Sequence, residues 1–149
     1  MGRLLTMYGI EASIKTAAEE ETWAPLDDGF DNVAEALNET VQQYYFLKDK
    51  GFARNHVTGM APAFTLTGRR VIGDPAQDFI FAAKYKLDSN RQTQFKLTYL
   101  DSSNKAVTLT CDVTLCNIQE WSGAATDDSA ISVEIRFDGA PEVSTSPTV

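Results

Sequence analysis

The chain has 149 residues, of which 43% are hydrophobic and 23% charged, and its mean hydropathy is −0.24. This length suits one domain with a single core, and the composition excludes the disordered class, which is poor in apolar residues. Thirteen basic against twenty-one acidic residues give a formal net charge of −8, which disfavours DNA binding because duplex affinity comes mainly from Lys and Arg on phosphates.

No targeting or cross-linking signal stands out. The N-terminal segment lacks the apolar run of a signal peptide, and no segment approaches the ~20 apolar residues of a membrane helix, so we expect no membrane anchor. Cys111 and Cys116 lie about 17 Å apart in one predicted strand at ~3.4 Å per residue, beyond disulfide reach. Because His56 is the only histidine, the sequence also predicts no Cys/His metal site. Two free thiols fit a reducing compartment.

Alternating patterns mark the first part of the chain as β-rich. Apolar and polar side chains alternate over residues 10–15, the period of a strand with one buried face. The acidic run 19–21 predicts a solvated turn before Trp23. Residues 31–37 fit the spacing of a helix as well as a strand, so the local pattern leaves their structure open.

An aromatic strand follows. Residues 42–47 contain Tyr44, Tyr45 and Phe46, which favour a strand. The polar segment 48–51 predicts a loop, and a further strand runs through Val57 before a turn at residues 59–62.

The helix signal is the sharpest local feature. A strand at residues 64–68 precedes Asp74, which has the position of an N-cap. Pro75 occupies the first helical position, and Gln77 lies three residues after the cap, as in a capping box. Residues 88–90 end the predicted element. The apolar stripe at helical spacing consists of Ala76, Phe79, Ile80 and Ala83.

The last third predicts a long hairpin and a final strand. Residues 95–99 and 107–115 alternate across a turn at 101–104. A small acidic loop, 122–129, precedes a cleanly alternating strand at 131–137.

These elements predict a mainly β fold: a β-sandwich or open barrel of about seven to eight strands with one α-helix packed on its flank. The single domain covers residues 8–140. We expect residues 1–7 to form a flexible N-terminal arm. We expect residues 141–149 to form a flexible C-terminal tail, because this segment is rich in Ser, Thr and Pro and has little to bury. Such a sheet has edges, and exposed edges are templates for pairing with another chain.

Catalytic and ligand-binding signals are weak, so we expect no enzyme, no cofactor and no metal. His56 has no second histidine or nucleophile motif beside it. Residues 68–73 have a spacing similar to a P-loop, but Asp74 stands where the phosphate-binding Lys belongs and would repel a phosphate. The acidic residues at 27–31 and 127–128 match no EF-hand loop.

The ordered set of elements from about Tyr8 to Asp138 resembles the major tail tube proteins of long-tailed bacteriophages. The segment from Gly73 to Phe79 carries its sharpest part. The other parts are the aromatic strand, the Gly51 loop, Val57 to Gly59, the strand from Phe64 to Gly68, Arg69 with Arg70, the long hairpin and the final strand.

The resemblance implies a structural virion protein. Six subunits would join edge to edge into a ring, and rings would stack into a tube whose lumen passes DNA without specific binding. It further implies tape-measure, tail-terminator and baseplate or tip proteins as partners, location in the virion tail, and assembly in the host bacterial cytoplasm. It also favours a strand for residues 31–37.

The resemblance assigns assembly roles to two groups of residues. The loop with Lys48, Asp49, Lys50 and Arg54 would contact the neighbouring ring, against the alternative of an ordinary solvated hairpin tip. Arg69 and Arg70 would form ion pairs between subunits or pair within the chain with Asp74 or Asp78. The N-terminal arm and the C-terminal tail would become ordered on stacking.

Other functions stay open at this point. A monomeric β-sandwich that binds a ligand would use an aromatic platform, with Trp23 and Trp121 as the residues to inspect. A small hydrolase on a β-barrel would need two titrating groups in one cleft. Within the tube class, a secretion-type tube or a tail-terminator protein would share the architecture.

Overall fold

The computed structural model describes residues 2–17 and 21–145. Glu19 and Glu20 of the predicted acidic turn, and residues 1 and 146–149 of the predicted arm and tail, lie outside them. The described part has one α-helix, α1 (Pro75–Ala82), and three short 3-10 helices, η1 (Met7–Gly9), η2 (Leu47–Asp49) and η3 (Asp88–Arg91). The strands are β1 (Glu11–Lys15), β2 (Trp23–Pro25), β3 (Phe30–Ala36), β4 (Thr40–Tyr44), β5 (Arg54–Gly59), β6 (Ala63–Arg69), β7 (Gln92–Leu100), β8 (Ala106–Gln119), β9 (Ala130–Phe137) and β10 (Glu142–Thr145).

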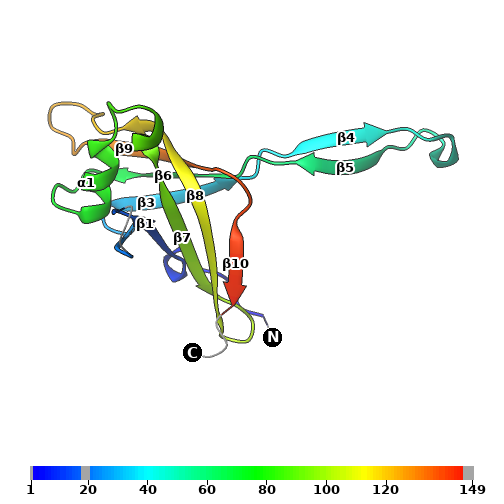
Figure 1. The fold of residues 1–149 in the computed structure, drawn as a ribbon, viewed down its shortest axis with the longest axis horizontal. Helices are drawn as coiled ribbons and strands as arrows, with labels where there is room; N and C mark the ends of the chain where they lie inside the picture. The colour runs from blue at the N-terminus through cyan, green and yellow to red at the C-terminus, as the bar shows by residue number, and fades with distance from the viewer. Residues whose placement is uncertain (1, 18–20, 146–149) are drawn as a thin grey trace.

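One antiparallel sheet forms the body of the molecule, with the strand order β2-β1-β7-β8-β9-β6-β3 (Figure 1). The long strand β8 organises it. One edge of β8 pairs with β7, while its other edge pairs with β9 from Val113 onward and with β10 over residues 107–110. The predicted mainly β fold with one helix is confirmed.

The main sheet curls into an open barrel. Its two end strands, β2 and β3, are joined by only four residues, 26–29, which span at most about 17 Å when extended. The rings of Phe64 on β6 and Phe95 on β7 have centroids 5.4 Å apart, although two strands lie between them. In a flat sheet these strands would be about 14 Å apart. The curl therefore brings side chains from distant strands into contact on the inner face of the sheet, where they form the core.

Side chains on the inward face of the central strands fill this core. Ile131, Val133 and Ile135 of β9 are buried, as are Val107, Cys111, Val113 and Leu115 of β8. α1 packs beside β2 and β8 and contributes Ile80 and Phe81 to the same cluster. Within the predicted stripe, Ala76, Ile80 and Ala83 are buried, but Phe79 is only half-buried.

Two glycines permit close approach where the sheet closes. The Gly29 carbonyl accepts a hydrogen bond from the Arg69 N–H at 2.7 Å, which brings the β2–β3 loop against the end of β6. A Cβ atom on Gly68 would overlap the Gly29 carbonyl oxygen and lie 2.8 Å from the Cα atom of Phe30. Gly29 itself has φ of +83°, a conformation that favours glycine.

Several boundaries differ from those predicted. α1 ends at Ala82, well before residues 88–90, which begin a separate 3-10 helix. β4 ends at Tyr44, and the chain reaches η2 through Tyr45 and Phe46. The strand β10 departs from the expected C-terminal tail: its one apolar side chain, Val143, gives no alternation to read, but its backbone pairs with β8. Residues 30–36 form the strand β3, as the resemblance implied for this part of the chain.

Candidate assembly surfaces

The hairpin of β4 and β5 extends away from the body (Figure 1). The two strands pair only with each other, from Thr40 opposite Gly59 to Tyr44 opposite Arg54. An isolated two-stranded hairpin is marginally stable in water, because it has no layer against which to bury either face. This element therefore gains stability from whatever covers it.

The hairpin exposes large apolar side chains, most strongly around its tip. Leu47 is 98% exposed, Phe52 is 78% exposed and Tyr45 is 67% exposed. Tyr44 and Phe46 stack on each other, with ring centroids 5.7 Å apart. Contiguous exposed apolar surface of this kind marks interaction sites in soluble proteins.

The predicted assembly residues Lys48, Asp49, Lys50 and Arg54 all lie at this tip. Asp49 accepts a hydrogen bond from Arg54 (Nη2 to Oδ1, 3.1 Å) and forms an ion pair with it (Nε–Oδ2, 2.7 Å), so this pair holds the loop closed. Arg54 also lies over the ring of Phe46 at 5.7 Å. Lys48 and Lys50 are exposed. The segment 47–54 thus carries three positive charges and one negative charge, whereas the rest of the chain holds ten basic and twenty acidic residues.

Arg69 and Arg70 lie at the opposite end of the molecule, beside α1, and their side chains have different environments. Arg70 pairs with Asp78 (2.9 Å) and with Glu120 (2.8 Å), so the intrachain alternative with Asp78 is the one the structure forms. Its guanidinium carbon also lies 4.9 Å from the centre of the Phe81 ring. Arg69 is exposed, and its guanidinium donates to the backbone carbonyl of Asp128.

Glu120 is shared by two cations. It accepts from Lys84 at 2.5 Å and from Arg70 at 2.8 Å, and its side chain is 13% exposed. Burial opposes ionisation, but the hydrogen bonds from Lys84 and Arg70 outweigh it and hold the pKa of Glu120 below its ordinary value. The network fixes the β8–β9 connection to the end of α1.

The helix start is half of a capping box. Asp74 accepts from the Gln77 N–H at 3.1 Å and Pro75 begins the helix, so the predicted N-cap is confirmed. The reciprocal bond from the Gln77 side chain to the Asp74 N–H is not formed. The Asp74 N–H instead donates to the carbonyl of Val71 at 3.4 Å, which frees the Gln77 amide for other partners.

Gln77 uses this amide to close the barrel. It is fully buried, and its Nε2 donates to the carbonyl oxygens of Asp28 (2.9 Å) and Arg69 (3.0 Å). Its Oε1 accepts from the Val71 N–H at 2.7 Å. One side chain thus satisfies backbone groups of the β2–β3 loop and of the chain leaving β6.

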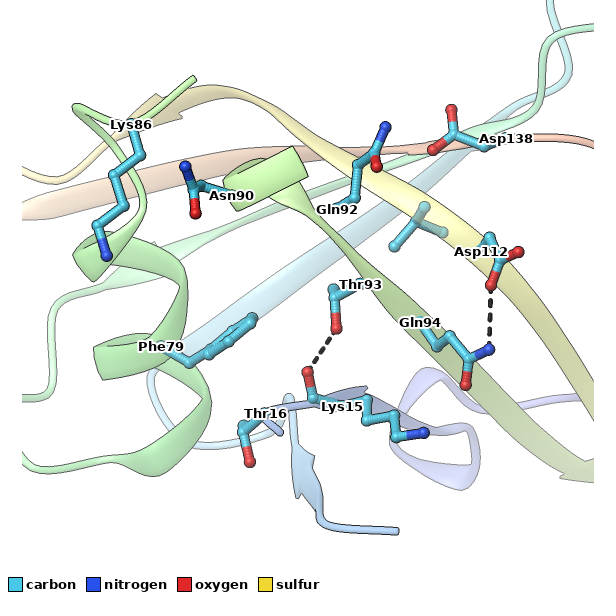
Figure 2. A pocket seen from close by; sticks show the side chains of 11 residues that line it. Lys15, Thr16, Phe79, Lys86, Asn90, Gln92, Thr93, Gln94, Asp112 and Asp138 are labelled. Atoms are coloured by element: carbon cyan, nitrogen blue, oxygen red, sulfur yellow. Dashed lines mark hydrogen bonds between the residues drawn. The ribbon is translucent and has the colours of Figure 1, made fainter. Parts of the chain in front are cut away.

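A depression with a volume of about 610 Å³ lies beside α1, against β1, β7 and β8 (Figure 2). Its polar side chains mostly stabilise the sheet. Thr93 donates to the Lys15 carbonyl at 2.6 Å, and Asp112 accepts from Gln94 at 3.0 Å. The lining contains no His or Cys among the described residues, so it holds no nucleophile paired with a histidine base.

The other candidate chemistries find no support in the described residues. Over residues 2–17 and 21–145, no three His, Cys, Asp or Glu side chains are grouped as metal ligands, and no helix there is long and apolar enough to cross a membrane. His56 lies exposed on β5 of the hairpin. The two tryptophans form no shared platform: Lys96 lies over Trp23, and Lys84 lies 3.1 Å from the centre of the Trp121 ring.

The strand edges offer further surfaces. β3 ends the main sheet, and in the described part of the chain no strand pairs with its outer edge. Five of its seven residues are exposed, and Phe30 and Val33 are half-buried. Unpaired edges of this length are templates for strand addition.

Solved structures resemble this architecture closely in three dimensions, although neither a family model nor a curated protein sequence matches the chain. The tail tube of SPP1 superposes with a TM-score of 0.72 at 12% identity, over 95% of this chain and 80% of that one. A chain from the tail of an empty gene transfer agent particle has a TM-score of 0.70 at 10% identity, covering 95% and 99%. The chain has the tail tube fold.

The tail tube fold also occurs in a capping protein. The tube-terminating cap of the anti-feeding prophage superposes with a TM-score of 0.64 at 12% identity, over 98% of this chain and 94% of that one. At these identities the shared property is the fold. The expected resemblance is therefore confirmed at the level of architecture, and the assembly roles of individual residues stay predictions.

Proposed function

We propose that this protein is a structural tail tube subunit that self-associates into stacked hexameric rings and performs no catalysis. The projecting hairpin carries the proposal. It is a two-stranded element with exposed aromatic residues, on a body with the tail tube fold, and in a single chain nothing in the main sheet covers these residues. The C6 symmetry stated for the gene transfer agent tail supports six subunits per ring.

Ring closure uses the strand edges. Pairing the outer edge of β3 with a neighbouring subunit would satisfy backbone donors and acceptors that water otherwise satisfies. Such a contact joins different surfaces of two identical chains, and it closes into a ring when the rotation between subunits permits.

Stacking uses the hairpin tip, with Lys48, Asp49, Lys50 and Arg54 in contact with the adjacent ring. The terminal arms would become ordered as the rings stack. In the single chain, Arg3 already donates to the carbonyls of Leu100 and Asp101, so the N-terminal arm starts from a defined anchor at the β7–β8 turn.

The tube would be a conduit for DNA. The net charge of −8 per subunit makes the assembled wall repel phosphates, so DNA would pass without specific binding. The partners would be the tape-measure, tail-terminator and baseplate or tip proteins. The protein would be located in the virion tail, which would be assembled in the cytoplasm of the host bacterium.

One observation favours a second candidate, a protein that caps a tube. The anti-feeding prophage cap shares the fold over nearly the whole chain. A cap would form rings that accept one neighbour and then stop, whereas a tube subunit adds rings repeatedly.

Light scattering and electron microscopy over a concentration series separate these functions. Tubes of many rings support the tail tube function, and isolated rings support the cap. Monomers that persist at all concentrations and salts with intact termini would refute both. Deleting residues 48–54 should abolish stacking while the far-ultraviolet circular dichroism and melting transition persist, since the main sheet pairs with no part of the hairpin.

A further inference from the structure

A second exposed apolar surface surrounds α1, at the end of the molecule opposite the hairpin (Figure 1). We call it the helix-end patch. Its members come from the loops before and after α1 and from the β8–β9 loop, which the contact of Lys84 with Trp121 holds against the end of α1. They are Ile72 (87% exposed), Tyr85 (82%), Leu87 (79%) and Trp121 (68%).

The helix-end patch and the hairpin tip have opposite charge. Six acidic residues flank the patch against three basic ones. Arg70, Lys84, Glu120 and Asp78 do not alter this excess, because they pair with one another. The acidic residues are Asp27, Asp28, Asp74, Asp88, Asp127 and Asp128, and the basic ones are Arg69, Lys86 and Arg91. The tip, by contrast, has an excess of positive charge through Lys48 and Lys50, because Arg54 pairs with Asp49.

A rival surface is less complementary. Leu4 (93% exposed), Tyr8 (89%) and Val143 (64%) are exposed near the β7–β8 turn. There the carboxylates of Asp101 and Glu142 are matched in number by Lys105 and Arg3, so this surface has no excess of negative charge to attract a cationic tip.

We propose that the helix-end patch is the surface that receives the hairpin tip of another copy of this chain. This inference rests on the proposed function and names the receiving half of the contact between rings. The two surfaces are different, so the contact is head to tail and leaves a free tip at one end and a free patch at the other. Such an interface propagates, whereas a contact between two hairpin tips would stop at a pair.

The test compares three pairs of substitutions at exposed positions. The tip variant is Leu47→Ser with Phe52→Ser, the patch variant is Ile72→Ser with Leu87→Ser, and the rival-surface variant is Leu4→Ser with Val143→Ser. The tip and patch variants should each raise the concentration needed for stacking at least tenfold, on the order of the loss of one buried apolar side chain. The rival-surface variant should stack within about threefold of the wild type. Unchanged thermal unfolding checks that each variant folds.

Mixing the first two variants tests the direction of the contact. Tip-variant particles keep intact patches and patch-variant particles keep intact tips, so an equimolar mixture should form stacks of two layers that do not grow. Normal stacking by the patch variant, or a mixture without two-layer stacks, would overturn the inference while wild-type tubes still upheld the proposed function. Wild-type protein that never assembles would remove the proposed function itself.

Charge reversal gives an independent readout. Asp128→Lys and Lys48→Glu should each weaken stacking and reduce its sensitivity to salt, and the double variant should recover stacking relative to either. Glu11→Lys on β1 is the matched control, since it changes the net charge equally at a distant exposed position. An effect of Glu11→Lys as large as that of Asp128→Lys would attribute the result to net charge and overturn the assignment.

Discussion

Replacement of Gln77 by Leu should open the closure of the barrel. Leu fills a similar volume but cannot satisfy the backbone groups of Asp28, Arg69 and Val71 that the amide now bonds. Each unsatisfied backbone group costs about 1–3 kcal/mol. We take about 1.5 kcal/mol for each, because a carbonyl can recover some hydrogen bonding to water, and the three groups together then cost about 4.5 kcal/mol. The buried apolar side chain returns about 1.5 kcal/mol. The net loss is therefore about 3 kcal/mol, a large share of the stability of a domain, which is typically about 5–15 kcal/mol.

Urea unfolding monitored by circular dichroism measures this loss as a lower midpoint at an unchanged slope. Gln94→Leu is the matched control, because Gln94 is half-buried on β7 and its side chain donates a hydrogen bond to the Asp112 side chain and none to the backbone groups of the barrel closure. We expect it to cost less than about 1 kcal/mol. If the two variants lose the same stability, or if Gln77→Leu loses less than about 1 kcal/mol, the closure of the barrel does not depend on the Gln77 amide.

Three further predictions concern single residues. Glu120→Gln should lower the stability at neutral pH and make the stability depend less on acid. A carboxyl whose pKa is lowered by folding contributes stability that is complete above its unfolded pKa of about 4.3 and is lost as the pH falls through its folded pKa. Melting temperatures between pH 3 and 7 measure this, and an equal fall of the melting temperature with acid in both proteins would contradict it. Gly68→Ala should cost about 3 kcal/mol or prevent folding because its Cβ meets backbone, whereas Gly59→Ala, with only ordinary contacts, should cost less than about 1 kcal/mol in the same denaturation assay. Iodoacetamide should modify Cys116 in the native protein but Cys111 only on unfolding, since burial shields the Cys111 thiol and raises its pKa; equal labelling rates by mass spectrometry would refute this.

The sequence predicts those parts of the fold whose signal is local. Alternation over residues 131–137 identifies β9, and the Asp74 cap identifies the start of α1. β10 escapes such reading because its pairing with β8 is a backbone interaction of residues with little apolar content. The end of α1 is missed because Lys84 and Lys86, which suit a helix C-terminus, bind the β8–β9 connection or line the depression instead.

The candidate surfaces follow the same division. The hairpin tip can be recognised in the sequence because aromatic residues and a polar turn are contiguous at 44–54. The helix-end patch cannot, since Ile72, Leu87 and Trp121 lie in three separate loops that folding places at the end of the molecule with α1. The role of Gln77 is hidden for a similar reason: its partner Asp28 lies 49 residues away.

The separation of the hairpin from the main sheet has an evolutionary consequence. Because β4 and β5 pair only with each other, substitutions on them leave the ladders and core of the scaffold untouched. Selection can then alter which neighbours a subunit accepts without endangering its folding. Under the proposed function, lineages that share this architecture would diverge in compatibility first, and subunits from two sources in one cell would still build unmixed filaments.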